Sequence, residues 1–221
     1  MTEVASKRGV FITLEGGEGA GKSTQIRRLD EKLQSLGFDT LLTREPGGTP
    51  GAEAIRHVIL SGFAEQFGAD VEAMLFSAAR SDHVTHVIKP ALEAGKLVIC
   101  DRFFDSTRVY QGASGKVDMA FLKSLEKIAC EDAWPDLTLI LDLDPEEGMR
   151  RAGTRREEGA EPDRFEKENM ENQKIRRDAF RKIVEDEPER CVLVDANGSE
   201  EEVAQRIWEA VEPRLNMSNQ D

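Results

Sequence analysis

The stretch VFITLEGGEGAGKS, residues 10–23, decides the fold of this chain. Its first part, Val10 to Glu15, is an apolar, β-prone run that stops at a glycine, which predicts a buried strand. The segment from Ser23 to Leu36 predicts an amphipathic helix, because its apolar residues recur at helical spacings. These residues are Ile26, Leu29, Leu33 and Leu36. A glycine-rich turn therefore joins a strand directly to a helix.

Predicted strands and helices alternate along nearly the whole chain. Further strands are predicted at Thr40–Thr43, Leu97–Cys100, Leu137–Leu143 and Cys191–Val194, and further helices at Ala52–Leu60 and Val71–Leu92. Such alternation predicts an α/β fold with a five-stranded, mostly parallel sheet and helices on both faces, because parallel neighbours need crossover connections. The strand order stays open. With 221 residues, a single domain over residues 1–221 is expected.

The chain is strongly acidic, with 30 Lys and Arg against 43 Asp and Glu and a formal net charge of −13. This balance argues against a general nucleic-acid binder, which needs a basic face, but allows a small anion in a locally positive pocket. The three cysteines are far apart, so they resemble neither a disulfide framework nor a zinc site. No signal peptide or membrane-spanning run is recognisable, so we expect a cytoplasmic protein with no membrane partner.

Residues 16–23 match the pattern G-x-x-x-x-G-K-[ST] in full, after a strand and at the start of a helix. In this setting backbone N–H groups converge on phosphate oxygens, and the helix N-terminus adds a positive dipole. Lys22 is expected to reach the β- and γ-phosphates, and the Ser23 hydroxyl to hold Mg²⁺. The predicted ATP-binding residues are Gly16, Gly17, Glu18, Gly19, Ala20, Gly21, Lys22 and Ser23.

Asp101 and Arg102 follow the predicted strand Leu97–Cys100. An acid at the carboxyl end of a strand beside the phosphate loop is a natural Mg²⁺ partner, together with Ser23. Arg102 is suited to a second phosphate, because a guanidinium matches phosphate geometry. The alternative is a surface ion pair after a strand. The motif Asn-Lys-x-Asp, which a GTPase switch uses to read guanine, does not occur in the sequence.

The chain resembles the thymidylate kinase family in several motifs that occur in order. These are GGEGAGKS (16–23), TREPGGT (43–49), LFSAAR (75–80), DRF (101–103), STRVYQG (106–112), PDLT (135–138) and DRFE (163–166). The phosphate loop is shared with many nucleotide-binding proteins, whereas the REPGG and YQG motifs are more specific. The resemblance implies a P-loop NTPase fold and transfer of the ATP γ-phosphoryl group to dTMP with Mg²⁺, giving dTDP for dTTP synthesis. It also implies a homodimer.

The resemblance further implies a dTMP site. Its residues are Glu18, Arg44, Pro46, Phe76, Arg80, Arg102, Ser106, Thr107, Tyr110 and Gln111. Glu18 is expected near the 3′-hydroxyl of the acceptor sugar. Arg44 and Arg102 are expected at the acceptor phosphate, where they shield its charge. A cis peptide bond is expected before Pro46.

The base and the sugar have separate candidate contacts within this set. Phe76 is expected to stack on the thymine ring, and Arg80, one helical turn later, to hydrogen-bond its edge. Tyr110 is expected under the deoxyribose, where its ring excludes a 2′-hydroxyl. Further polar contacts around the base are expected from Ser106, Thr107 and Gln111.

Residues 150–164 form a highly charged segment with two glycines, one proline and no apolar stripe. One interpretation is a solvated connection, and the other is a lid that closes over an anion. The resemblance favours a lid whose arginines, Arg151, Arg155 and Arg156, replace an arginine that some family members carry in the phosphate loop, where this chain has Gly19. We expect one of them to join Lys22 and Arg102 in catalysis on the transferring phosphoryl group.

Two other functions stay open at this point. One is a kinase of another nucleotide or nucleoside, although the set Phe76, Arg80 and Tyr110 favours dTMP over UMP. The other is a regulatory protein that uses ATP as a switch, but this function leaves the acceptor-side arginines without a purpose. The chain also departs from many relatives at Phe103 and Phe104, where a Tyr or His and then a smaller residue are common, so we expect one polar contact fewer there.

Overall fold

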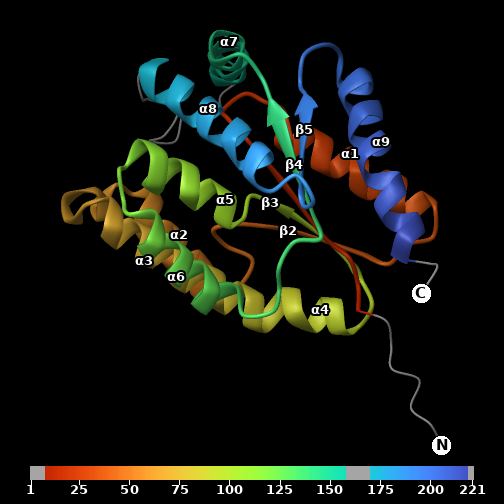
Figure 1. Ribbon diagram of the computed structural model, residues 1–221, viewed down its shortest axis with the longest axis horizontal. Coiled ribbons are helices and arrows are strands. Elements are labelled where there is room, and N and C mark those ends of the chain that lie inside the picture. The colour runs from red at the N-terminus through yellow and green to blue at the C-terminus, as the bar shows by residue number, and fades with distance from the viewer. Residues whose placement is uncertain (1–7, 158–169, 219–221) are drawn as a thin grey trace, which may run out of the picture.

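A five-stranded parallel sheet forms the centre of the computed structural model, which describes residues 8–157 and 170–218, with side chains for 8–153 and 170–215 (Figure 1). The strands are β1 (Phe11–Gly16), β2 (Thr40–Arg44), β3 (Leu97–Asp101), β4 (Leu137–Asp142) and β5 (Cys191–Asp195). Their order is β2-β3-β1-β4-β5, and every neighbouring pair is parallel. This arrangement confirms the predicted fold class and settles the strand order, with β1 in the middle.

Helices cover both faces of this sheet (Figure 1). The helices are α1 (Lys22–Ser35), α2 (Pro50–Leu60), α3 (Ala69–His83), α4 (Lys89–Glu93), α5 (Phe104–Thr107), α6 (Met119–Cys130), α7 (Pro145–Glu157), α8 (Met170–Asp186) and α9 (Glu200–Ser218). Shorter or wider turns are η1 (Phe63–Phe67), η2 (Val84–Ile88) and η3 (Arg108–Ser114). None of the helices within the described ranges is both long and apolar enough to cross a bilayer.

The alternation of side chains along β1 explains why both faces are covered. Ile12 and Leu14 lie in the core that α1 and α9 close, with Leu33 of α1 fully buried against them. Phe11 belongs to the core on the opposite face, with residues of η2 and α4. Both faces of the strand are therefore removed from water, as is usual for a parallel strand in the middle of a sheet.

Two predicted boundaries differ from the structure. The predicted helix Val71–Leu92 is divided into α3, the π-helical turn η2 and α4. The charged segment, which was expected to form a lid from residue 150, begins as the last two turns of α7. Its helical start has a local cause, because Glu147 pairs with Arg150 and Arg151 at 2.7 Å each, the spacings that support a helix.

Shortening single side chains of the sheet should show how much stability the burial of its apolar residues provides. Leu139→Ala in β4 removes a fully buried side chain, and we expect the free energy of unfolding to fall by about 2–5 kcal/mol. Leu193→Ala in the edge strand β5 is the matched control, because that side chain is 40% exposed and should cost less than about 1 kcal/mol. Urea unfolding of both variants measures these changes. Equal losses of unfolding free energy would contradict the conclusion that β4 lies in the buried centre of the sheet and β5 at its edge.

Candidate active site

The carboxyl ends of β1, β2 and β3 lie side by side, because the register pairs Leu14 with Asp101 and Asp101 with Arg44. The loops that leave these strands therefore meet at one edge, where parallel α/β sheets bind their ligands. A cavity of about 440 Å³ opens there. It is lined by Glu18, Gly19, Ala20, Gly21, Lys22, Ser23, Thr24, Arg44, Glu45, Pro46, Arg56, Leu60, Phe76, Arg80, Asp101, Arg102, Phe103, Ser106, Thr107, Tyr110, Gln111 and Arg151.

The cavity thus gathers most of the residues that the sequence predicts as site residues. Gly16 and Gly17 belong to the same loop but do not line it. The side chains of Arg155 and Arg156 lie outside the described residues, as does most of the expected lid beyond α7. The peptide bond between Glu45 and Pro46 is cis, which confirms the expectation for that loop.

Lys22 is held inside the phosphate loop. Its ammonium donates hydrogen bonds to the carbonyl oxygens of Gly16 at 3.0 Å and Gly17 at 2.8 Å. Burial and the nearby charge of Arg102 lower the pKa of Lys22. Gly21 precedes the helix with φ of 85°, a left-handed conformation that glycine adopts without a steric cost. The loop therefore presents a positive charge and the start of α1 to the cavity.

The phosphate loop also contacts α7 directly, through the backbone of Gly19. A Cβ added at Gly19 would lie 2.1 Å from the carbonyl oxygen of Gly148, and one added at Gly148 would lie 2.5 Å from that of Glu18. The two backbones therefore meet with no room for a side chain between them. This contact brings α7 and its Arg151 to the rim of the cavity.

Asp101 and Ser23 offer hard oxygen ligands on the floor of the cavity. Ser23 Oγ lies 3.4 Å from Asp101 Oδ2, and Asp101 Oδ1 is buried with no hydrogen-bond partner among the described residues. Within the same ranges, no cluster of three His, Cys, Asp or Glu side chains could hold a metal. Mg²⁺ fits these residues, because it commonly takes one or two protein oxygens and fills its octahedron with phosphate and water.

Glu18, Arg102 and Tyr110 form a hydrogen-bonded group that links the phosphate loop to the rest of the cavity. Glu18 Oε1 accepts hydrogen bonds from Arg102 Nη2 and from the Tyr110 hydroxyl, both at 2.9 Å. Burial alone would raise the pKa of Glu18, but the charges of Arg102 and Lys22 outweigh it and hold this pKa at about 2. The carboxylate is therefore ionised at neutral pH. The guanidinium of Arg176 lies 4.1 Å from the centre of the Tyr110 ring.

Arg80, which is 3% exposed, also lines the cavity, and neighbouring side chains hold its guanidinium. Arg80 Nε donates to Glu45 Oε2 at 2.7 Å, and Nη2 donates to Thr107 Oγ1 at 3.3 Å. The other oxygen of Glu45 lies 3.1 Å from His83 Nδ1, and His83 Nε2 lies 2.7 Å from Thr43 Oγ1. His83 is thus a fully buried packing partner of the loop.

Two further arginines at the cavity are held by neighbouring acids. Arg44 pairs with Glu53 at 2.7 Å and is half exposed. Arg151 pairs with Glu147 at 2.7 Å and donates to the carbonyl oxygen of Ala196 at 3.2 Å. Both can exchange these partly exposed partners for an anion, because an ion pair near the surface is worth only about 1 kcal/mol or less.

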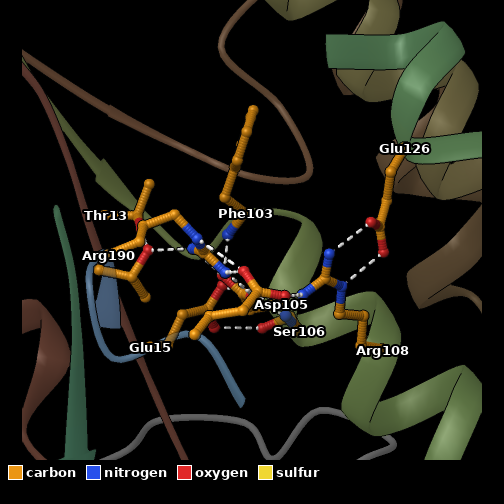
Figure 2. Close-up of polar contacts among 10 residues, drawn as sticks. Thr13, Glu15, Phe103, Asp105, Ser106, Arg108, Glu126 and Arg190 are labelled. Carbon is orange, nitrogen blue, oxygen red and sulfur yellow. Dashed lines mark hydrogen bonds and ion pairs between the residues drawn. The ribbon is translucent and has the colours of Figure 1, made fainter. Parts of the chain in front are cut away.

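One buried acid, Glu15, does not line the cavity and was not singled out as a site residue by the sequence analysis; its polar contacts are shown in Figure 2. Glu15, the penultimate residue of β1, is fully buried and accepts hydrogen bonds from Phe103 and Ser106. Burial and the neighbouring Asp105 raise the pKa of Glu15 to about 7, although Arg102 opposes the shift. The only signal in the sequence is a charged residue at the end of an otherwise apolar strand.

Comparisons with known proteins concern nearly the whole chain. The family model described as Thymidylate kinase matches residues 14–207. A thymidylate kinase of Bradyrhizobium sp. (strain BTAi1) is 54% identical over 219 residues, which cover 97% of this chain and 96% of the relative. One of Afipia carboxidovorans is 54% identical over 214 residues, covering 97% and 93%. The crystal structure of thymidylate kinase from Ehrlichia chaffeensis has a TM-score of 0.73 and 31% identity, covering 92% of this chain and 99% of that one.

Glu15→Gln should change how stability depends on pH. Glu15 has a pKa of about 7 in the folded chain against an ordinary 4.5, so the folded chain holds this proton more tightly than the unfolded chain does. The resulting contribution to stability is complete below about pH 4.5 and is lost as the pH rises through about 7. Across that window we expect the wild type to lose unfolding free energy relative to the variant, by at most about 1.4 kcal/mol per pH unit. Urea unfolding at several pH values measures this. A pH-independent difference between the two proteins would contradict it.

Proposed function

The chain belongs to the thymidylate kinase family and phosphorylates dTMP to dTDP, and we propose that the cavity at the carboxyl edge of the sheet holds ATP and dTMP end to end. The arrangement of cations carries this proposal. Lys22 of the phosphate loop, Arg44 at the end of β2 and Arg102 directly after β3 line the same cavity. A triphosphate alone needs the first of these, whereas the other two suit a second anion that faces it.

At the donor end, the phosphate loop binds the ATP phosphates through its backbone N–H groups and the Lys22 ammonium. The hydroxyl of Ser23 and the carboxylate of Asp101 would hold Mg²⁺. When bound, this ion neutralises charge on the phosphate oxygens during transfer. The hydrogen-bonding capacity that Asp101 Oδ1 leaves unused supports this assignment.

At the acceptor end, the ionised Glu18 accepts a hydrogen bond from the 3′-hydroxyl of the deoxyribose, and the Tyr110 ring fills the space that a 2′-hydroxyl needs. Phe76 stacks on the base and Arg80 donates to its edge. The bond from Arg80 Nε to Glu45 supports this role, because it fixes the plane of a guanidinium that lines the cavity. Polar contacts from Thr107 and Gln111 complete the set.

Catalysis then rests on alignment and charge neutralisation, with no covalent intermediate. Lys22 and Arg102 flank the transferring phosphoryl group, and a third guanidinium comes from α7 or the segment after it. Arg151 lines the cavity, which supports it as one candidate. Arg155 and Arg156, four and five residues farther along α7, are the other two candidates.

An ADP-release assay over a panel of nucleoside monophosphates tests the proposed function. We expect ADP to appear with ATP and dTMP together, and dTDP to form in equal amount. ADP formation without an acceptor would favour the regulatory ATPase instead. A preference for another monophosphate would favour the other kinase.

We also propose a cytoplasmic homodimer. The three cysteines are free and buried, which suits a reducing compartment. The neighbouring elements α2, η1 and α3 expose large apolar side chains, including Val58, Phe67 and Met74, which supports a covered surface. Sedimentation of the purified chain would measure the oligomeric state.

Lys22→Ala should remove activity without unfolding the chain. Lys22 provides the charge that the phosphate loop directs at the γ-phosphate, so we expect kcat/KM to fall by about 10³-fold or more. Lys32→Ala is the control, because it changes the same residue type at the exposed end of the same helix. Rates of dTDP formation and the melting temperature are measured together. Retained activity in Lys22→Ala would count against the proposed site.

Tyr110 should control selection of the sugar. Tyr110→Ala opens space beneath the ribose, so we expect the ratio of kcat/KM for dTMP over ribothymidine monophosphate to fall about 10–100-fold. Tyr110→Phe keeps the ring and removes the hydrogen bond to Glu18, so it should preserve most of that ratio. The idea fails if both variants retain wild-type discrimination.

A further inference from the structure

Glu15 does not line the cavity, yet it binds Phe103 and Ser106, which follow Arg102 in the chain (Figure 2). Its Oε1 accepts hydrogen bonds from Phe103 N at 2.7 Å and Ser106 N at 3.2 Å, and its Oε2 accepts one from Ser106 Oγ at 2.6 Å. Three donors thus converge on one side chain, and an ionised carboxylate is the group that accepts from all of them. A strand residue before the phosphate loop thereby holds the segment that follows β3.

Arg102 needs such a grip, because its backbone is in the left-handed region with φ of 68°. A non-glycine residue there is strained and persists only where its surroundings hold it. Arg102 N donates to Leu14 O at 2.9 Å on one side of the turn, and Glu15 binds Phe103 N on the other. Two consecutive residues of β1 therefore hold the turn at Arg102.

The hydroxyl of Ser106 extends this grip to the side chain of Arg102. Ser106 Oγ donates to Glu15 and accepts a hydrogen bond from Arg102 Nη1 at 3.0 Å. The other terminal nitrogen of Arg102 is bound to Glu18. Both terminal nitrogens of the guanidinium are thus held. Ser106 connects Nη1 to the buried Glu15, and Glu18 connects Nη2 to the phosphate loop.

The surrounding charges direct Glu15 toward Arg102. Asp105, the nearest competing acid, is fully buried and is paired with Arg190 at 2.7 Å and with Arg108 at 3.4 Å. Arg108 is in turn paired with Glu126 at 2.7 Å (Figure 2). These pairs compensate Asp105 only in part, because it still raises the pKa of Glu15, whereas the charge of Arg102 lowers it and favours the carboxylate.

We propose that Glu15 is a positioning residue for phosphoryl transfer, whose carboxylate holds the strained turn at Arg102 and, through Ser106, orients the Arg102 guanidinium toward the acceptor phosphate. This inference rests on the proposed role of Arg102 in the dTMP site. Glu15 touches neither nucleotide and acts through another residue. Its removal therefore affects the acceptor more than the donor.

Steady-state kinetics of Glu15→Gln at pH 8, where Glu15 is ionised in the wild type, tests the proposal. We expect kcat/KM for dTMP to fall about 10–100-fold, because small misplacements of a phosphate-binding group are costly, while the KM for ATP stays within about twofold. Wild-type kinetics for dTMP would overturn the proposal. So would an equal rise in the KM of both nucleotides, which indicates a general distortion of the loop.

Glu126→Gln is the matched control, since Glu126 is a buried acid of the same network that does not line the cavity. We expect a lower melting temperature with unchanged kcat/KM. A fall in kcat/KM for dTMP equal to that of Glu15→Gln would overturn the proposal, because the effects of both variants would then reflect a general loosening of the buried charge network.

A double-mutant cycle tests whether Glu15 acts through Arg102. In an Arg102→Lys background, Glu15→Gln should cost less than about twofold further, because the group that it positions has already been changed. Multiplicative losses would overturn the proposal. If Glu15→Gln does not fold, Glu15→Asp, which keeps the charge on a shorter side chain, replaces it in the same cycle with the same expectation.

These results separate the inference from the proposed function. If the wild type forms no dTDP, the proposed function itself fails. If the wild type forms dTDP and Glu15→Gln does so with unchanged constants, only the inference about Glu15 fails.

Discussion

Repulsion between two phosphorylated nucleotides is the constraint on which this structure depends. A chain with a net charge of −13 must still bring the anionic tails of both into one cavity. Among the described residues, the lining of the proposed site carries six cationic side chains, Lys22, Arg44, Arg56, Arg80, Arg102 and Arg151, against three acids, Glu18, Glu45 and Asp101. The positive potential is therefore local, and the acidic exterior does not prevent anion binding.

Buried cations need compensation before any ligand arrives, and acids inside the site supply it. Glu18 binds Arg102 and Glu45 binds Arg80, in each case with a hydrogen bond of 2.9 Å or less. These pairs also set directions, because each leaves the guanidinium only part of its hydrogen-bonding capacity. The same contacts that limit the cost of burying charge therefore preorganise the groups that meet the substrates.

Local sequence patterns predict the framework and the phosphate loop, and the family resemblance adds most of the other cavity residues, whereas contacts between distant segments remain beyond both. The strands, the phosphate loop and the loop at Pro46 are predictable because short runs of residue types determine them. The strand order is not, since it depends on how the strands pack. Glu15 also escapes prediction, because its partner Phe103 is 88 residues away and only the pairing of β1 with β3 brings the two together. The helical start of the charged segment depends on Glu147, which lies outside that segment.

The contact between Gly19 and Gly148 explains why the arginines of this chain lie where they do. A side chain at position 19 would collide with the backbone of α7, so an arginine in the phosphate loop and the present seat of α7 exclude one another. With glycine at both positions, α7 packs directly on the loop and Arg151 reaches the cavity three residues after Gly148. The helix that follows β4 therefore begins directly against a phosphate loop that carries no arginine of its own. The close packing of the two glycines therefore sets the position of α7 against the phosphate loop, and with it the place from which Arg151 approaches the cavity.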